Sequence, residues 1–223
     1  MKSNSALGVI IAVLCACLNL QAFEVYKFCG PVTYNLSRDF SATNNPARVW
    51  SYGATMTLGV EFALFTYHYS VIEASGSLTE GWQLVPHLEP TIHRNSSNIT
   101  NYSDGGQAVY PPGTVTLFSG TDGVPYPYGV ARFTVPHNGA GRYLVKTSVE
   151  SYISGPLSGD TDFHVLKNGV ELFGRWLPGN SQTAFSATLR LKKGDTIDFV
   201  VGRGADGSGS YSGLKITASL AKK

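Results

Sequence analysis

Segments in which apolar and polar residues alternate follow one another through the C-terminal part of this chain. The alternation is unbroken over residues 185–191, and residues 192–195 then supply a Lys-Lys-Gly-Asp turn. It resumes with Ile197, Phe199 and Val201 on one side. A period of two places one face of a strand in a core and the other in water. Strands of this kind joined by tight turns build a sandwich or a barrel, and not an α/β enzyme.

The same rhythm continues upstream and predicts most of a core. Asn168-Gly169 lies between two apolar-bearing runs, which favours a type I′ hairpin because both central residues need a positive φ. Apolar residues at alternate positions from Met56 to Leu64 predict a further strand. The other expected inward-facing residues are Ala131, Phe133, Val135, Tyr143, Val145, Thr147, Val149, Leu214, Ile216, Ala218 and Leu220. Since no segment keeps a helical period, we expect one all-β domain, an antiparallel β-sandwich of roughly eight to ten strands.

The middle of the chain, residues 67–113, has the least regular pattern. Its Asn/Ser-rich part, residues 94–106, has too little apolar content for a core strand and is expected to be an exposed loop. Four Asn-x-Ser/Thr sequons begin at Asn35, Asn95, Asn98 and Asn101. Sequons are glycan acceptors only in a host with that machinery. The alternative, which we favour, is that they are Asn-rich loops and nothing more.

The N-terminus has the layout of a secretory signal peptide. An apolar run over residues 6–18 follows a lysine, and the chain turns polar before Ala22, a small residue at a cleavage position. The run is shorter than the ~20 residues of a spanning helix, which argues against a retained membrane anchor. A lipoprotein is a further alternative, because the Leu-Cys-Ala-Cys stretch loosely resembles a lipobox. We expect residues 1–22 to be removed and residues 23–223 to form one secreted or cell-surface domain without a membrane span.

Cleavage at this point would leave Cys29 as the sole cysteine, so no intramolecular disulfide is expected. A lone thiol in a secreted chain is either buried or paired with another chain, and we favour burial.

Charge and motif content narrow the function classes. The net charge is +2 and no basic stripe is present, so nucleic acid is not an expected partner. None of the five histidines has a metal-type spacing, and no G-x-S-x-G elbow occurs. A glycosidase carboxylate pair that meets only in the fold stays open. The sequence therefore predicts a non-catalytic protein, with no catalytic residues and no cofactor.

Two Asp-containing loops raise the question of calcium. Asp160-x-Asp162 and the Asp206-Gly207 stretch supply the oxygen ligands that calcium prefers, but neither matches an EF-hand loop. Asp and Gly also suit the backbone of ordinary turns. We favour turn chemistry and predict no metal site, with calcium as the alternative.

Aromatic residues offer a physical basis for carbohydrate binding. Sugar rings present C–H faces to aromatic planes, and a few placed polar groups fix their orientation. Trp176, Trp82, Tyr126 and Tyr128 are the predicted ligand-binding residues. The competing interpretation for each tryptophan is core packing, where aromatic residues usually go. Trp50 lies in a predicted strand and is assigned to the core.

Several segments together resemble a known kind of domain. The segments are GVARFTVP (129–136), DFHVLKNG (162–169), TLRLKKGDTIDFVVG (188–202) and, upstream, VWSYG (49–53). Their order is similar to that of a jelly-roll domain common in exported bacterial proteins, many of them from Planctomycetes. The resemblance spans nearly the whole mature chain and implies a jelly-roll fold and export. That family has no firmly assigned activity.

A weaker similarity covers only the C-terminal half. The order of strand, Leu-x-Leu-x-x-Gly-Asp turn, strand, Gly-rich loop and Tyr-Ser-Gly resembles the globular heads of complement and tumour-necrosis-factor-like trimers. It implies assembly through a sandwich face. Two hypotheses therefore stand: a binding module for polysaccharide or surface glycan, and a self-assembling structural protein of a surface layer, fibre or trimer. The second would make the chain a homo-oligomer.

Overall fold

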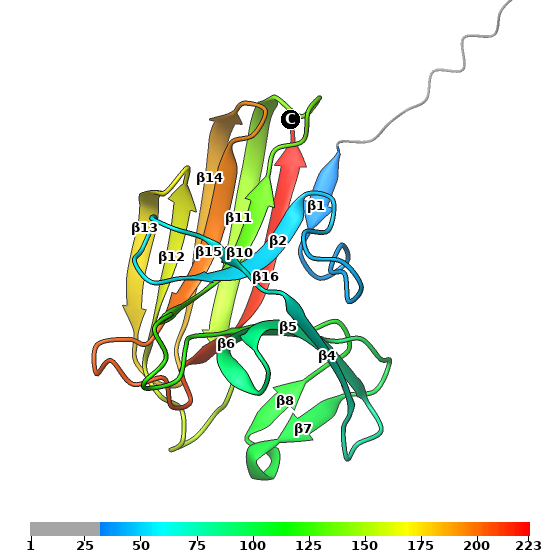
Figure 1. The fold of residues 1–223 in the computed structure, drawn as a ribbon, viewed down its shortest axis with the longest axis vertical. Helices are drawn as coiled ribbons and strands as arrows, with labels where there is room; N and C mark the ends of the chain where they lie inside the picture. The colour runs from blue at the N-terminus through cyan, green and yellow to red at the C-terminus, as the bar shows by residue number, and fades with distance from the viewer. Residues whose placement is uncertain (1–31) are drawn as a thin grey trace, which may run out of the picture. The chain divides into compact units, whose positions relative to one another are not determined.

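The alternating segments form two antiparallel β-sheets (Figure 1). The computed structural model describes residues 32–223, and the predicted signal peptide and all three cysteines lie outside this range. The first sheet contains, in spatial order, β14 (Gln182–Leu191), β11 (Gly141–Ser151), β16 (Gly213–Lys222), β9 (Val115–Phe118), β6 (Leu88–Asn95), β5 (Leu78–Val85) and β4 (Tyr67–Ile72), and β1 (Thr33–Asn35) also pairs with β16. The second contains β13 (Val170–Leu177), β12 (Thr161–Lys167), β15 (Thr196–Gly202), β10 (Tyr128–Thr134), β2 (Trp50–Thr55) and β3 (Ala63–Leu64). A separate hairpin of β7 (Asn101–Ser103) and β8 (Ala108–Tyr110) encloses a 3₁₀ turn, η1 (Asp104–Gly106).

The eight strands β9 to β16 have jelly-roll connections. The order β9-β16-β11-β14 in one sheet faces β10-β15-β12-β13 in the other. Every connection crosses between the sheets except the β12–β13 hairpin, which is the arrangement of two nested Greek keys. The predicted all-β antiparallel sandwich is therefore confirmed, with sixteen strands in the described residues in place of roughly eight to ten. In this part of the chain no helix has the length and apolar character needed to span a bilayer.

The core lies between the inward faces of the two sheets and follows the predicted alternation. All the inward-facing residues predicted on or beside β10, β11, β15 and β16 are at most 4% exposed. Trp50 is fully buried, and its ring meets Phe133 edge-on at a centroid distance of 5.6 Å. Aromatic rings that bury this much area dominate the hydrophobic stabilisation of a small core. The assignment of Trp50 to the core is confirmed.

The β12–β13 hairpin and the loop that covers it show one confirmed prediction and one that is wrong. Asn168 and Gly169 both have positive φ, at 50° and 77°, as the predicted tight turn requires. Residues 56–62, however, form a loop and not a strand. Gly59 has φ of 75°, and a Cβ there would lie 2.1 Å from the Gly169 carbonyl oxygen, so only glycine allows the loop to dock. The loop covers the outside of the second sheet, where it contributes to a small apolar cluster of Leu58, Phe62, Tyr128, Val130, Leu166 and Val200.

The middle region is more regular than predicted. Strands β4, β5 and β6 extend the first sheet beyond β9, where a largely unpatterned segment was expected. Most of β4 is exposed or only partly buried, so its residues lack the strong apolar alternation of a core strand. Strands with such weakly contrasting faces carry little hydrophobic signal in the sequence.

The sequon region is partly buried and not a wholly exposed loop. Asn95 is 2% exposed, and Asn101 is 6% exposed. The Asn95 amide donates to the Ile99 and Tyr110 carbonyl oxygens at 2.7 and 2.8 Å. These two amides are therefore part of the fold, which favours a structural role over glycan attachment at both positions. The Asn98 side chain is exposed.

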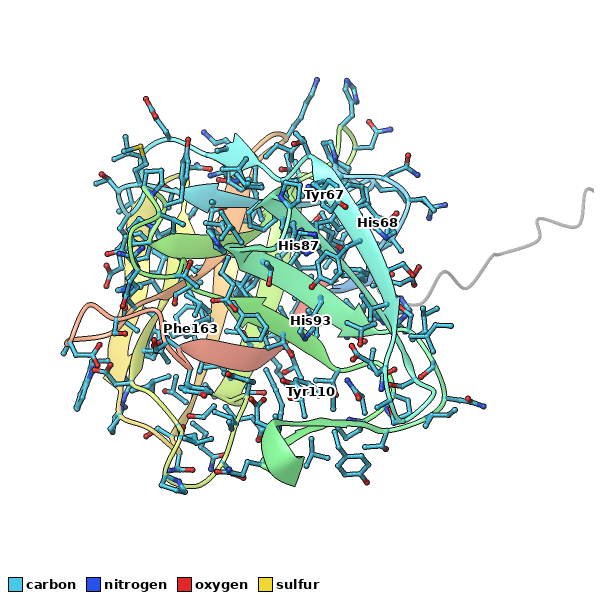
Figure 2. The ribbon with its side chains drawn as sticks, turned by 60° about the horizontal axis from the view of Figure 1, so that its bottom comes forward. Tyr67, His68, His87, His93, Tyr110 and Phe163 are labelled. Atoms are coloured by element: carbon cyan, nitrogen blue, oxygen red, sulfur yellow. The ribbon has the colours of Figure 1, made fainter. Side chains whose placement is uncertain are left out.

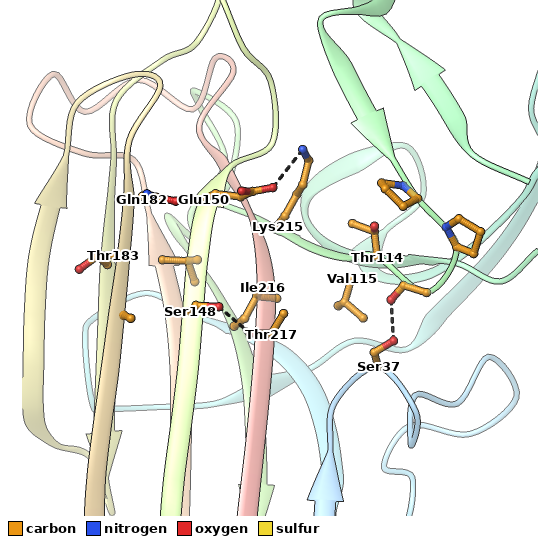
Figure 3. A pocket seen from close by; sticks show the side chains of 15 residues that line it. Ser37, Thr114, Val115, Ser148, Glu150, Gln182, Thr183, Lys215, Ile216 and Thr217 are labelled. Atoms are coloured by element: carbon orange, nitrogen blue, oxygen red, sulfur yellow. Dashed lines mark hydrogen bonds and ion pairs between the residues drawn. The ribbon is translucent and has the colours of Figure 1, made fainter.

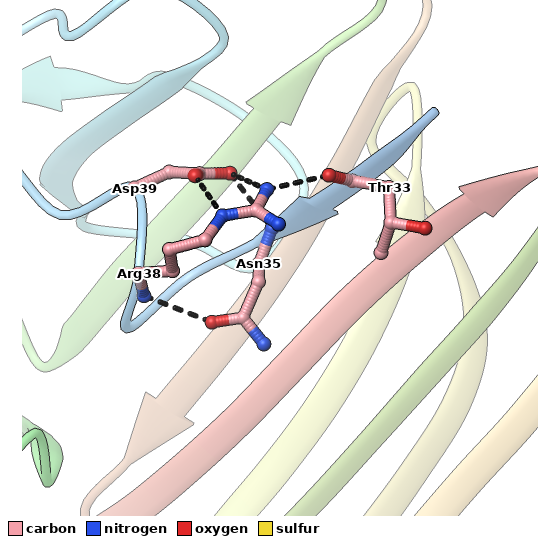
Figure 4. A network of polar contacts seen from close by, with 4 residues as sticks. All are labelled: Thr33, Asn35, Arg38 and Asp39. Carbon is pink, nitrogen blue, oxygen red and sulfur yellow. Dashed lines mark hydrogen bonds and ion pairs between the residues drawn. The ribbon is translucent and has the colours of Figure 1, made fainter. Parts of the chain in front are cut away.

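A compact polar network holds the turn that follows β1 (Figure 4). The Arg38 guanidinium donates to the Thr33 carbonyl oxygen at 2.5 Å and forms an ion pair with Asp39 at 2.7 Å. The other end of the turn is fixed by Asn35, whose amide oxygen accepts from the Arg38 backbone at 2.9 Å. Because β1 pairs with β16, this network fixes the chain where it enters the first sheet.

Two titratable residues on β6 have strongly shifted pKa values. His93 packs beside Tyr110 and Phe118 (Figure 2 labels His93 and Tyr110), with ring centroids at 5.7 and 5.2 Å. Its Nδ1 lies 3.2 Å from the Tyr69 hydroxyl. Removal from water lowers the pKa of His93 to about 4 and raises the pKa of Glu89 to about 7. Both groups are therefore held in their neutral forms over the mildly acidic range.

Replacing Glu89 by Gln should stabilise the protein only at higher pH. A folded pKa above the unfolded value means that the native state loses stability as pH rises from about 4.3 to about 7. The Glu89→Gln variant should match the wild type at pH 4 and exceed its free energy of unfolding by about 1–2 kcal/mol at pH 8. Urea unfolding at the two pH values measures this, and equal stability at pH 8 would contradict it. The pH dependence of stability that arises from His93 has the opposite sign to that of Glu89. It is the same in the wild type and the variant, so it cancels in the comparison.

Candidate functional site

The outer face of the second sheet carries a row of polar and aromatic side chains at its β13 edge. Phe163 points into the core, so its neighbours Asp162 and His164 on β12 point outward. Trp176 of β13 is the direct partner of Asp162 in the strand pairing and therefore shares its face. The row combines an aromatic ring, carboxylates and an imidazole on paired strands that hold them in fixed positions.

Trp176 has the geometry of a stacking surface. It is 52% exposed, although it belongs to a strand. Its indole Nε1–H donates to Asp160 Oδ2 at 2.6 Å, which fixes the ring orientation. A ring held in place and open to solvent can receive an apolar ligand face without first losing rotamer freedom.

Asp160 is the anchor of this ring. Its Oδ2 also accepts the Ala205 backbone N–H at 2.9 Å. Burial alone would raise the pKa of Asp160, but the hydrogen bonds from Trp176 and Ala205 hold it below its ordinary value. The carboxylate is therefore ionised at neutral pH and binds the indole through a charge-assisted hydrogen bond.

A second carboxylate, Asp162, organises the centre of the row. Its Oδ1 accepts the Gly204 backbone N–H at 2.7 Å, and its Oδ2 lies 2.5 Å from His164 Nε2. On the far side of the imidazole, Nδ1 lies 3.5 Å from Glu171 Oε2. The histidine is thus held between two carboxylates, and nearly half of the Glu171 side chain stays exposed and able to accept further hydrogen bonds.

Gly202 allows Tyr128 to join this cluster. A Cβ at Gly202 would lie 2.5 Å from Asp162 Oδ1 and 2.6 Å from Tyr128 Cε1. The absence of a side chain at this position lets the tyrosine ring of β10 reach across β15 toward the carboxylate on β12. Burial, followed by the negative charges of Asp162 and Glu171, raises the pKa of Tyr128. The phenol therefore stays neutral and can donate a hydrogen bond.

The four predicted ligand-binding residues are not all brought together. Trp176 and Tyr128 lie on the outer face of the second sheet. Trp82 is 7% exposed in β5 and its Nε1–H donates to the Ser41 carbonyl oxygen at 2.7 Å, so it offers no open ring face. Tyr126 packs against the main core from the loop before β10.

Several neighbours of Trp176 were not predicted as ligand-binding residues. Asp160 and Asp162 were considered only for calcium, and within residues 32–223 no three His, Cys, Asp or Glu side chains are grouped to hold a metal ion. His164 and Glu171 carried no motif. One signal in the sequence could have indicated them. Polar residues alternate with apolar ones along β12, and the strand that forms a hairpin with β12 carries Trp176.

Comparisons with known proteins do not place the chain in a family. No family model matches the sequence. No curated protein matches it either, so the resemblance to exported planctomycete domains and to complement-like heads stays a prediction.

Several solved structures with some similarity contain carbohydrate-binding modules. One is CBM51 of Clostridium perfringens GH95 in complex with methyl-galactose, with a TM-score of 0.43, 14% identity, and 85% of this chain and 99% of that chain covered. Another is CBM51-2 with INT domains of Clostridium perfringens ZmpB in complex with GlcNAc (0.40, 11%, 71% and 40%). A third is CBM35 of Paenibacillus barcinonensis (0.28, 13%, 68% and 98%). All three TM-scores are below 0.5, so the function has to be argued from the chain's own residues.

Proposed function

We propose that this protein is a secreted or cell-surface, non-catalytic module that binds carbohydrate through Trp176. The observation that carries the proposal is the half-exposed indole fixed by Asp160 beside a row of hydrogen-bonding groups. Asp162, Glu171 and Tyr128 are the polar groups of the site. Sugars need this combination of one flat apolar surface and a few oriented donors and acceptors.

The chemistry of the row favours a neutral or weakly basic sugar over an acidic one. Three carboxylates, those of Asp160, Asp162 and Glu171, belong to the same row as the indole. Charges at such close range disfavour an anionic ligand through Coulomb repulsion. Carboxylates also accept strong hydrogen bonds from sugar hydroxyls. Polysaccharide or surface glycan without acidic groups is therefore the proposed partner.

Replacing Trp176 by Ala should abolish most carbohydrate binding and leave the fold intact. The ring supplies the apolar contact, so its loss should raise the Kd at least tenfold, about 1.4 kcal/mol. Because the side chain is half exposed on an edge strand, the melting temperature should stay close to that of the wild type. Binding of the purified protein to immobilised glycans, followed by titration with the strongest ligand, measures both effects.

Two further variants make this test specific. Trp176→Phe keeps an aromatic face but loses the N–H donated to Asp160, so it should retain part of the affinity. Leu172→Ala removes another exposed side chain of β13 and should bind like the wild type. Wild-type affinity in Trp176→Ala would exclude this ring as the platform, and the absence of any glycan ligand for the wild type would remove the proposed function.

A self-assembling structural protein is the second candidate. Within the described residues β14 has a hydrogen-bonded neighbour on one side only, β11, although it is ten residues long. An unpaired strand edge of this length can pair with the same edge of a second copy. Light scattering on the purified protein separates the two functions, because a monomer at high concentration is incompatible with assembly through this edge.

A further inference from the structure

The outer face of the first sheet, on the opposite side of the sandwich from Trp176, holds a groove of about 790 Å³. Its floor is formed by β14, β11 and β16, and one wall by Ser37 and residues 111–114 (Figure 3). A second depression of about 470 Å³ shares Ser148, Ala184 and Thr217 with the first, so the two are continuous. We call their combined length the sheet groove.

The wall of the sheet groove is held in place before any ligand arrives. Ser37 Oγ donates to the Gly113 carbonyl oxygen at 2.5 Å, and the Gly113 N–H donates to the Asn95 carbonyl oxygen at 2.9 Å. Asn95 is the buried amide that also holds Tyr110. Two consecutive prolines, Pro111 and Pro112, restrict the backbone further. A preformed wall lowers the ordering cost of binding.

The floor of the larger depression is polar and carries no net charge, since Lys215 and Glu150 are the only charged residues among the described ones that line it, and Lys146 lines the smaller depression. Ser148 and Thr217 form a hydroxyl pair at 2.7 Å in its centre, and Lys215 donates to Glu150 at 3.3 Å at one end (Figure 3). None of the described residues that line the larger depression has an aromatic ring. Hydroxyls both donate and accept, so this lining matches a ligand that is itself rich in hydroxyl groups.

The sheet pairing excludes an extended peptide that would bind by strand addition. Strand β11 is hydrogen-bonded to β14 on one side and to β16 on the other, and β16 also pairs with β9. Within the floor, β11 and β16 therefore offer side chains and not the free backbone edge that strand addition requires, and the free edge of β14 lies at the side of the sheet. An acidic polymer is disfavoured at the larger depression as well, because Lys215, the one basic residue among its described lining residues, is already paired with Glu150.

The length of the groove points to a polymer and not to a single ring. Glu150 lines one depression and Lys146 the other, and they lie four residues apart on β11. At ~3.3 Å per residue this separation is about 13 Å. We propose that the sheet groove is a second binding site, separate from Trp176, for a segment of a neutral, linear polysaccharide chain. This inference shares with the proposed function only the premise that the ligand is a carbohydrate.

A pair of arginine substitutions on one strand tests the proposal. Ala184 faces Ser148 directly and lines both depressions, whereas Thr188 lies four residues further along the same exposed face of β14 and lines neither. Ala184→Arg should therefore block the groove, and Thr188→Arg is its matched control. Thr217→Val keeps the side-chain shape and removes one hydroxyl of the floor.

Affinity electrophoresis through gels containing soluble xylan, galactan, glucomannan or dextran gives the readout. With the polysaccharide that retards the wild type most, Ala184→Arg should weaken binding at least tenfold and Thr217→Val several-fold, while Thr188→Arg stays within twofold. Equal melting temperatures of the three variants would exclude unfolding as the cause.

The outcomes separate the groove from the Trp176 site. Retardation of Ala184→Arg equal to that of the wild type, with loss of retardation in Trp176→Ala, would overturn the groove and leave the proposed function standing. Loss in Ala184→Arg with full retention in Trp176→Ala would support the groove and exclude the Trp176 site. Absence of wild-type retardation in all four gels would overturn both.

Discussion

Truncation of Phe199 to Ala should lower the free energy of unfolding by about 3–5 kcal/mol, as is usual for a buried aromatic residue. Phe199 is fully buried in the middle of β15, between β10 and β12, and its ring lies 6.3 Å from that of Trp50. Because β15 is flanked by β10 and β12, the surrounding structure cannot collapse into the space that the ring leaves behind. The cost therefore includes a cavity as well as the lost transfer free energy.

Urea or thermal unfolding of Phe199→Ala measures this loss. In Phe199→Leu the leucine fills most of the volume of the original ring, so this variant should retain more than half of the stability that Phe199→Ala loses. Leu172→Ala truncates an exposed apolar residue of β13, serves as the control and should cost less than about 1 kcal/mol. Wild-type stability in Phe199→Ala would mean that the assigned core face of β15 is wrong.

Replacement of Asp198 by Ala should cost about 3–5 kcal/mol for a different reason. Asp198 is 3% exposed and forms a two-point ion pair with Arg132, at 2.7 and 2.9 Å. The guanidinium also lies over the ring of Phe62 at 4.1 Å, beneath the loop that covers the outer face of the second sheet. Removal of the carboxylate would leave a largely buried positive charge without a partner.

A double variant distinguishes this cause from simple loss of packing. Asp198→Leu combined with Arg132→Met replaces the pair by apolar side chains and should recover most of the lost stability. Unfolding free energies of the wild type, Asp198→Leu, Arg132→Met and the double variant form a complete cycle. Additive losses in the double variant would show that the pair is not coupled.

The sequence predicted those elements in which hydrophobic alternation and core position coincide. Strand β15 is the clearest case, because Ile197, Phe199 and Val201 all face the core. The alternation from Met56 to Leu64 has the same appearance, but its apolar residues cover the outside of a sheet as a loop. An apolar pattern indicates that residues are buried, but it does not indicate whether they lie in a core strand or in a loop that packs on the outside of a sheet.

The candidate site could be predicted only in part for a related reason. Trp176 was identified, but its hydrogen bond to Asp160 depends on where β12 begins beside β13. The cluster of His164 and Glu171 likewise depends on the hairpin register, which contains an irregularity between Val165 and Leu166. The sheet groove exists because a loop rises beside the outer face of the sheet. Single polar residues such as Ser148 do not indicate this arrangement in the sequence.

The two sheets of the sandwich present their outer faces in opposite directions, and this separates Trp176 from the sheet groove by the thickness of the domain. One polymer strand cannot easily reach both places, whereas two strands can each occupy one. A protein with two binding sites on opposite faces would stay attached to a dense polysaccharide matrix. When one site releases its strand, the other site keeps the protein close to the matrix, so the free site binds again quickly. Its residence on a solid would then exceed what either face alone supports.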